Sequence, residues 1–387
     1  MNATKLTGVA LSAVLMSGCL LAGCTQQQSA DTDAGTQAAE EQAATRTVVD
    51  SNGQEVVIPA QVERVAPTMG AFAQATEMFC AGNGKIAAAS NNQISDAFKA
   101  VFTDYEKSNP NSYDSSSIED LIAADVQVVY GPASMYSDEQ LEQLRQAGIA
   151  VVALNKLSTV DDMCDNFLTI GEILGDEEYA RAQEFVEYYK QGIADAQQRA
   201  SKLSDSEKHT VLQMNVSGDQ YVCADDKDIS NAYYEAVGAK NVAAGFEGAQ
   251  SGQYRSVDAE QIVKWDPEYI ITMNTNVKDQ ILSDTALADV AAVKNGNVYV
   301  CPTALYLWCV RSAEGALMTP WLGSVMYPDL YADQDMTKVL QDFYKDFYKD
   351  FYSTDLSDAD AANILSGATS SGAGNPQGGQ GGQGQRG

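Results

Sequence analysis

The chain has 387 residues, of which 53 are acidic and 24 are basic, so its formal net charge at pH 7 is −29. Binding to nucleic acid depends on basic patches, and so does charge-driven docking on anionic lipid, so this balance argues against both. The chain contains a single histidine, His209, and none of its cysteines is spaced as CxxC. Multi-histidine zinc centres and dithiol motifs therefore have no support, and we expect neither a metal centre nor a cofactor.

The N-terminus is typical of a secretory signal, because Lys5 precedes an apolar run that is too short to span a membrane. The run ends in Leu21-Ala22-Gly23-Cys24, which resembles the bacterial lipobox and implies cleavage before Cys24 and a lipid on its sulfur. An ordinary secreted cysteine is the alternative. Residues 24–45 and 366–387 are too polar and glycine-rich to bury a core, so we expect a flexible tether and a disordered tail.

Residues 46–175 alternate predicted strands with predicted helices. The pair Asn52-Gly53 between two β-rich runs predicts a hairpin. The predicted strands that follow are Val62–Ala66, Ile86–Ala89, Val126–Tyr130 and Ile149–Leu154, and the predicted helices are Gly70–Ala81, Ser117–Ala123, Ser137–Gln146 and Thr159–Leu174. Such alternation favours a mostly parallel sheet.

Residues 176–203 carry apolar side chains at steps of three and four, which predicts one α-helix roughly 40 Å long. The strand and helix alternation restarts after it, and residues 259–270 align without gaps with residues 118–129. We therefore predict an α/β fold of two lobes, 46–175 and 204–365, joined by this helix. A long surface helix of one large domain is the alternative.

The second lobe has its own predicted elements. The strands are Thr210–Val216, Tyr269–Met273 and Asn297–Cys301, and the helices are Ser230–Val237, Asp258–Lys264, Ala313–Met326 and Met336–Tyr352. Cys301 and Cys309 are close enough in sequence to bridge the loop between them, but spacing alone does not establish a disulfide.

A ligand between two α/β lobes is expected to contact the loops that follow strands, because open α/β sheets bind ligands at the carboxyl ends of their strands. Arginine can hold a carboxylate or phosphate through two parallel hydrogen bonds, which favours Arg255 and Arg311. The alternatives are surface ion pairs for the arginines and core positions for the aromatic residues. The candidate ligand-binding residues are Met69, Asn92, Tyr130, Tyr136, Asn215, Tyr254, Arg255, Tyr306, Trp308 and Arg311.

Nothing in the sequence indicates catalysis. The motifs GxSxG and HExxH, the Walker motif and the dinucleotide-binding fingerprint do not occur, and His209 has no second base nearby in sequence. A cell-envelope hydrolase on an α/β scaffold is an alternative that would need a nucleophile beside a base. An adhesive or scaffold lipoprotein is indicated only by the flexible ends.

Residues 47–65, TVVDSNGQEVVIPAQVERV, resemble the opening of the iron-chelate and cobalamin solute-binding proteins of ABC importers, with D-x-x-G, then I-P and R-V. Further blocks that resemble this family are Thr76-Glu77 and residues 257–271, 292–302, 321–331 and 339–348. The resemblance implies two Rossmann-like lobes, a rigid connecting helix and a ligand gripped between the lobes. It also implies that one acidic residue on each lobe docks onto permease arginines. Glu77 matches the first of these, and Glu235 is the best match for the second.

The leading hypothesis is therefore a monomeric receptor without enzymatic activity, anchored by lipid at the extracytoplasmic face of the cell membrane. It would capture an iron chelate, either a siderophore or haem, and deliver it to an ABC permease and its ATPase. A cobalamin receptor of the same family is the alternative. Cys309 and Val310 stand where the family often has small residues before Arg311, so the resemblance does not fix the pocket's shape there.

Overall fold

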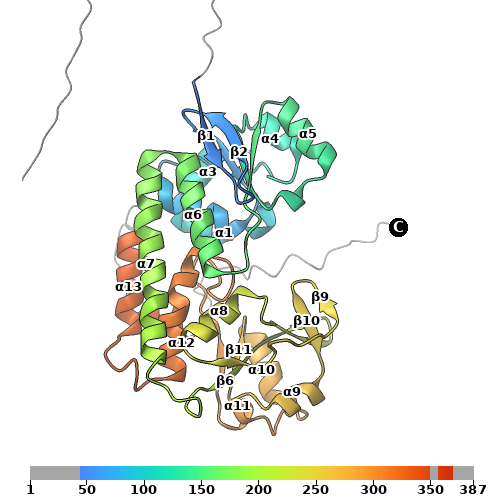
Figure 1. Cartoon of the computed structure of the whole chain (residues 1–387), viewed down its shortest axis with the longest axis vertical. Helices are drawn as coiled ribbons and strands as arrows, with labels where there is room; N and C mark the ends of the chain where they lie inside the picture. The colour runs from blue at the N-terminus through green and yellow to red at the C-terminus, as the bar shows by residue number, and fades with distance from the viewer. Residues whose placement is uncertain (1–43, 349–355, 369–387) are drawn as a thin grey trace, which may run out of the picture. The chain divides into compact units, whose positions relative to one another are not determined.

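The computed structural model describes residues 44–348 and 356–368, which are coloured in Figure 1. They all belong to one compact unit, Ala43–Gly387. The predicted signal segment, Cys24, residues 24–43 of the predicted tether, residues 369–387 of the predicted tail and the end of the predicted helix Met336–Tyr352 lie outside the described residues. The last predicted tether residue, Thr45, already belongs to the first strand. No helix within 44–348 and 356–368 is long and apolar enough to cross a membrane.

The first lobe is built on a three-stranded parallel sheet with the order β3–β4–β5. Its strands are β3 (Val65–Pro67), β4 (Val128–Gly131) and β5 (Ala150–Ala153), and β1 (Thr45–Val49) and β2 (Glu55–Pro59) form a separate antiparallel hairpin. The hairpin turns at Asn52-Gly53 as predicted, and Gly53 has φ 79°. Asp50 stabilises the turn by accepting hydrogen bonds from the backbone amides of Asn52 (2.8 Å) and Gln54 (2.9 Å).

Short helices fill the first lobe between these strands. They are α1 (Gly70–Cys80), η1 (Asn91–Gln93), α2 (Asp96–Val101), α3 (Asp104–Ser108), α4 (Ile118–Ala123), η2 (Ala133–Met135), α5 (Asp138–Gln146) and α6 (Val160–Leu174). Capping boxes begin α5 at Ser137 and α6 at Thr159, so their start points are set locally. The predicted strand Ile86–Ala89 is wrong. Ile86 pairs only with Val65 and Ala89 only with Asp114, so the segment changes partner before a ladder can form.

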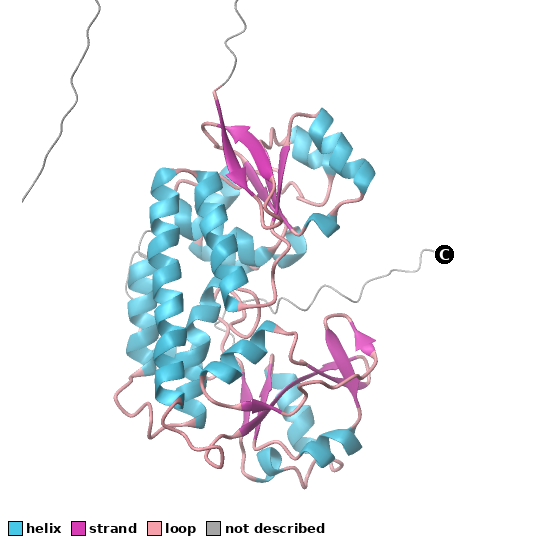
Figure 2. Ribbon diagram, in the orientation of Figure 1, coloured by secondary structure: helices cyan, strands magenta, loops and turns pink. Residues whose placement is uncertain are grey.

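The second lobe has a seven-stranded mixed sheet (Figure 2). Its strands are β6 (Thr210–Ser217), β7 (Gln220–Cys223), β8 (Lys240–Asn241), β9 (Gln250–Ser251), β10 (Tyr254–Val257), β11 (Tyr269–Thr272) and β12 (Val298–Val300). The parallel part contains β8, β6, β11 and β12, and an antiparallel extension continues from β6 through β7 and β10 to β9. This extension was not predicted, and its hairpins turn at Gly218 and Gly252, both with positive φ.

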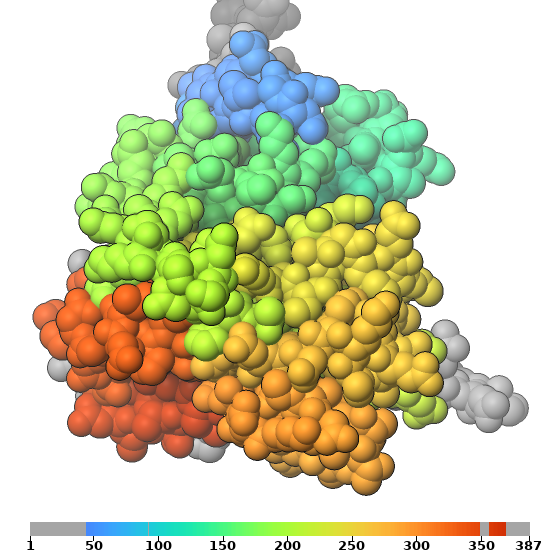
Figure 3. All heavy atoms as spheres, turned by 60° about the horizontal axis from the view of Figure 1, so that its bottom comes forward, coloured from blue at the N-terminus to red at the C-terminus, as the bar shows by residue number. Residues whose placement is uncertain are grey.

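The helices of the second lobe are α8 (Ile229–Ala236), α9 (Ala259–Trp265), α10 (Thr275–Ser283), α11 (Ala291–Lys294), η3 (Ala313–Leu317), α12 (Met318–Met326), α13 (Met336–Phe347) and α14 (Asp358–Leu365). Phe343 and Phe347 of α13 pack against Tyr188, at ring-centroid distances of 5.7 and 5.2 Å. Figures 1 and 3 both show α13 beside the connecting helix. Phe343 and Phe347 therefore serve the packing of α13 against the connecting helix.

One helix, α7 (Asp176–Ala200), connects the two lobes. Gly175, with φ 145°, separates it from α6, and three acidic residues occupy its first turn, where they suit the positive end of the helix dipole. Its 25 residues make a rod of roughly 37 Å. Residues 201–203, which were predicted to be helical, form a turn instead.

The buried stripe of α7 belongs to a hydrophobic core that also contains residues of both lobes. Phe185 contacts Phe167 of α6 at 5.3 Å and Phe347 of α13 at 5.3 Å between ring centroids. The fold is therefore α/β, with two Rossmann-like lobes joined by one long helix, as predicted. The exact lobe boundaries stay a prediction.

The cysteines of the described residues are all buried and free, so the considered bridge between Cys301 and Cys309 is not formed. A hydrogen bond between their side chains, together with burial, raises the pKa of the Cys309 thiol well above its usual value.

Candidate ligand-binding site

The two lobes meet where the loop that follows β12 reaches the start of α1. The hydroxyl of Tyr306 accepts a hydrogen bond from the backbone amide of Ala71, and burial raises the pKa of Tyr306 to about 12. A Cβ atom added at Gly70 would lie 2.9 Å from both Tyr306 Cε2 and Gln93 Cβ. Gly70 therefore lets the side chain of one lobe lie against the backbone of the other.

Arg311 makes a second link between the lobes. Its Nε donates to the backbone carbonyl of Leu157 at 2.7 Å, and its Nη1 donates to Gln253 Oε1 at 3.4 Å. Both acceptors are neutral, and no ion pair to Arg311 forms within residues 44–348 and 356–368. The guanidinium charge at the lobe contact is therefore not neutralised by a described carboxylate.

Tyr254 lies beside this guanidinium. Its hydroxyl accepts from Gln253 Nε2 at 2.8 Å and donates to Met273 Sδ at 3.7 Å. Burial raises the pKa of Tyr254 well above its usual value, the nearby charge of Asp228 adds to the shift, and Arg311 opposes it. Tyr254 therefore stays a neutral phenol, which can both donate and accept hydrogen bonds.

A buried carboxylate holds the loop that presents Tyr306. The two oxygens of Glu314 accept from the backbone amides of Leu305 (3.1 Å) and Tyr306 (3.1 Å), from Trp308 Nε1 (3.2 Å) and from the Tyr348 hydroxyl (3.2 Å). Burial raises the pKa of Glu314 to about 7, and these four hydrogen bonds oppose the rise. The loop at the lobe contact is thus fixed from inside the second lobe.

Arg255 already has partners within its own lobe. Its Nε donates to Asp225 Oδ2 at 2.8 Å and its Nη1 to Gln250 Oε1 at 2.8 Å. Burial alone would raise the pKa of Asp225, but the hydrogen bonds from Arg255 and from the Lys227 amide, together with the charges of both residues, outweigh burial and hold the pKa below its usual value. Arg255 lines a separate cavity of about 320 Å³ together with Lys227 and Glu247. Arg311 is not among the residues that line this cavity.

Four predicted ligand contacts are interior residues with internal hydrogen-bond partners, and their contact with a ligand stays a prediction. Tyr130 hydrogen-bonds Thr76, Tyr136 donates to the carbonyl of Ser115, Asn215 accepts from Thr272 and from the amide of Met273, and Trp308 donates to Glu314. All four are at most 6% exposed. Their polar atoms satisfy the core, so they do not face a ligand in this structure.

Met69 is half-buried at the N-cap of α1, next to the lobe contact. Asn92 lies in η1, and its side chain is outside the described part of the chain. The lobe contact therefore brings Met69, Tyr254, Tyr306 and Arg311 to one region. Sequence reasoning missed Gln93 and Gln253, which carry no local signal because neutral amides occur throughout loops.

The two predicted docking residues differ in exposure. Glu235 is exposed on α8 and accepts from Asn231 Nδ2 at 2.9 Å. Glu77 is completely buried in α1, and neither of its oxygens has a hydrogen-bond partner. Burial raises the pKa of Glu77 to about 8, and the charge of Asp104 adds to the rise. Glu77 therefore presents no surface carboxylate in this structure, and its docking on the permease stays a prediction.

A sequence profile of the periplasmic binding protein family matches residues 76–305, which is more than half of the chain. The chain therefore belongs to this family, and it is a substrate-binding protein of an ABC transporter.

Two curated relatives are similar in sequence. The molybdate-binding protein MolA of Haemophilus influenzae is 25% identical over 253 residues, which cover 61% of this chain and 71% of MolA. The uncharacterized ABC transporter substrate-binding lipoprotein YvrC of Bacillus subtilis is 25% identical over 289 residues, covering 74% of this chain and 87% of YvrC.

Among solved structures, a periplasmic solute binding protein from Veillonella parvula matches with a TM-score of 0.67 and 22% identity, covering 83% of this chain and 97% of that one. At this identity the likeness shows a shared fold.

Proposed function

We propose that this protein binds an anionic metal chelate, an iron siderophore or haem, at the contact between its lobes and releases it to the permease unchanged. The observation that carries this proposal is the guanidinium of Arg311, which has neutral partners and sits between the lobes. In a chain of net charge −29 an anion needs such a local cation. Catecholate, hydroxamate and propionate oxygens all accept hydrogen bonds from guanidinium.

The relative MolA, whose name states that it binds molybdate, supports a ligand that combines a metal with negative charge. A cobalamin ligand is the alternative within the same family, and it would depend less on Arg311 because its contacts are largely neutral. The two ligand classes therefore differ in how strongly they need the arginine.

The test is a ligand screen by tryptophan fluorescence with ferric catecholate, ferric hydroxamate, haem, cobalamin and molybdate. Trp308 reports on the lobe contact because it shares Glu314 with Tyr306. For an anionic chelate, Arg311→Ala should weaken binding by about tenfold to a hundredfold, since it removes a charge-assisted contact. Arg145→Ala is the matched control, because Arg145 is an exposed arginine of α5 paired with Glu142.

If cobalamin binds and Arg311→Ala has no effect on its affinity, the ligand is cobalamin and not an anionic chelate. If only molybdate binds, the ligand is the oxyanion. If none of the five ligands changes the fluorescence or the melting temperature, the proposed ligand class is wrong.

The attachment and docking proposals extend the same function. We propose that Cys24 carries a lipid, which Cys24→Ala should abolish in a labelled fatty-acid assay. Retained label would move the site to Cys19, which follows Met16-Ser17-Gly18, a second and poorer match to the lipobox. Glu235 is proposed to face the permease, so Glu235→Arg should leave ligand affinity unchanged and stop uptake, because repulsion replaces attraction. Uptake at the normal rate would remove Glu235 from that interface.

A further inference from the structure

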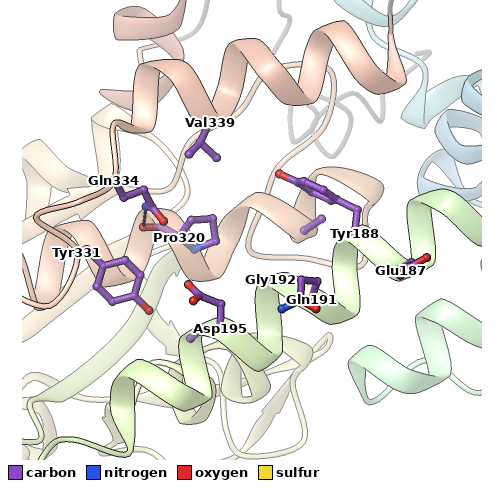
Figure 4. A pocket seen from close by; sticks show the side chains of 11 residues that line it. Glu187, Tyr188, Gln191, Gly192, Asp195, Pro320, Tyr331, Gln334 and Val339 are labelled. Atoms are coloured by element: carbon purple, nitrogen blue, oxygen red, sulfur yellow. Dashed lines mark hydrogen bonds between the residues drawn. The ribbon is translucent and has the colours of Figure 1, made fainter.

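A cavity of about 360 Å³ opens between α7, α12 and α13 (Figure 4). Its lining residues come from one face of α7 and from the segment between η3 and α13, and none of them belongs to the lobe contact described above. We refer to it as the α7–α13 cavity. Its volume lies in the range of small-molecule sites.

The hydroxyl of Tyr331 gives this cavity an unsatisfied polar group. Tyr331 lines the cavity and is 3% exposed, and its hydroxyl has no hydrogen-bond partner. A Cβ atom added at Gly323 would lie 2.0 Å from Tyr331 Cζ, and the guanidinium of Arg199 lies 4.7 Å from the ring centroid. The ring is therefore held in place, and a buried hydroxyl without a partner is costly unless something in the cavity bonds to it.

The charged groups of the lining are acidic. Asp195 accepts from Arg199 Nε through its Oδ2 at 2.7 Å, while its Oδ1 takes part in no hydrogen bond within the described residues. Glu187 is exposed at the rim and forms no ion pair there, and the lining contains no lysine or arginine. Figure 4 shows the carboxylate of Asp195 and the hydroxyl of Tyr331 turned toward the same space. These groups offer acceptors to a donor-rich, positively charged ligand.

Gly192 keeps the floor of the cavity open. It stands in the interior of α7, where glycine weakens a helix relative to alanine. No neighbouring atom requires it, because an added Cβ would meet only the Ala316 carbonyl at 3.7 Å and Thr319 Oγ1 at 3.9 Å. Its effect is to leave space in front of the apolar surface of Pro320 and Val339.

We propose that the α7–α13 cavity binds a small organic cation, with an ammonium or guanidinium group between Asp195 and Tyr331 and a short apolar body over Gly192. Such a ligand would satisfy the Tyr331 hydroxyl and the second oxygen of Asp195 together. This site is separate from the one proposed for the chelate, so neither depends on the other.

The probes are n-butylammonium and agmatine, with n-butanol and butyrate as neutral and anionic counterparts of similar size. Titration calorimetry on the full chain should detect the two cations with dissociation constants on the order of 1 mM or below, and neither counterpart. Equal binding of n-butanol, or no binding of either cation, would overturn the proposal.

Four variants test where the site lies. Asp195→Asn should weaken cation binding by about tenfold to a hundredfold, because it removes the charged acceptor. Gly192→Met should abolish binding by filling the cavity, whereas Glu184→Gln, an exposed position on the same helix outside the cavity, should change nothing. Gly192→Ala tests whether α7 tolerates a side chain there. If the folded Gly192→Met protein binds the cations as the parent does, the site is elsewhere.

Discussion

At the two links made by Arg311 and Tyr306, the lobes contribute different kinds of groups. The first lobe offers backbone, the carbonyl of Leu157 and the amide of Ala71. The second lobe offers side chains, the guanidinium of Arg311 and the phenol of Tyr306. A backbone surface is fixed by the fold and changes little with sequence, whereas side chains change with each substitution. At these two links the second lobe therefore supplies the groups that a substitution would change, while first-lobe side chains such as Gln74, which accepts from the amide of Ala313 at 3.3 Å, join the lobes elsewhere.

The two lobes also differ in how many hydrogen-bond donors surround their buried carboxyl groups near the contact. Glu314 of the second lobe has four hydrogen-bond donors around it, while Glu77 of the first lobe has none. Because an unpaired buried charge is costly, Glu77 is stable mainly as the neutral acid. Glu314 therefore accepts hydrogen bonds that hold a loop in place. The burial of Glu77 without partners instead lowers the stability of the first lobe.

The largest expected effect tests Glu314. Replacing Glu314 by alanine leaves four donors of the loop without an acceptor, so we expect a loss of about 3–5 kcal/mol in the free energy of unfolding. Urea denaturation measures it, and the emission of Trp308 should shift to the red as its indole loses its partner. Glu260→Ala, at an exposed position of α9, is the control. A loss below 1 kcal/mol, typical of a surface position, would remove the organising role of Glu314.

The second prediction concerns pH and Glu77. The pKa of Glu77 is raised from 4.5 to about 8, so between these values the folded chain keeps a proton that the unfolded chain releases. This contribution to stability is complete below pH 4.5 and is lost as the pH rises to about 8, at about 1.4 kcal/mol per pH unit. Glu77→Gln should flatten this decline and be at least as stable as the parent at pH 8.

Glu314 titrates in the same direction, because burial raises its pKa from 4.5 to about 7, so some decline with pH will remain in Glu77→Gln. Melting temperatures at pH 5, 6, 7 and 8 for the parent and for Glu77→Gln check the prediction. Parallel pH profiles of the two proteins would mean that Glu77 is ionised in the folded chain, and the contrast between the two carboxylates would not hold.

The smallest expected effect tests the side-chain half of the lobe contact. Tyr306→Phe removes the acceptor for the amide of Ala71, and we expect it to cost about 1 kcal/mol and to speed hydrogen exchange at that amide. Tyr299→Phe, at a half-buried position of β12, is the matched control. Unchanged exchange at Ala71 would show that the first lobe does not depend on this side chain.

The sequence by itself determined the features that depend on local periodicity and turn chemistry. The three- and four-residue spacing of Ala182, Phe185 and Tyr189 predicted α7, and Asn52-Gly53 predicted the first hairpin. The alternation of strands and helices predicted the two α/β lobes. These predictions succeeded because apolar spacing and glycine conformations act over a few residues.

The tertiary structure alone decided which polar and aromatic side chains face the lobe contact. Tyr130 ends a predicted strand, and Trp308 follows one as Tyr306 does. Both nevertheless lie in the core, because the segments that cover them are distant in sequence. Glu77 is buried because α6, α7, β3 and η3 all pack on α1. Burial depends on contacts between segments that are distant in sequence, and a local sequence pattern does not record such contacts. For this reason the contact gathers only four of the predicted residues: Met69, Tyr254, Tyr306 and Arg311.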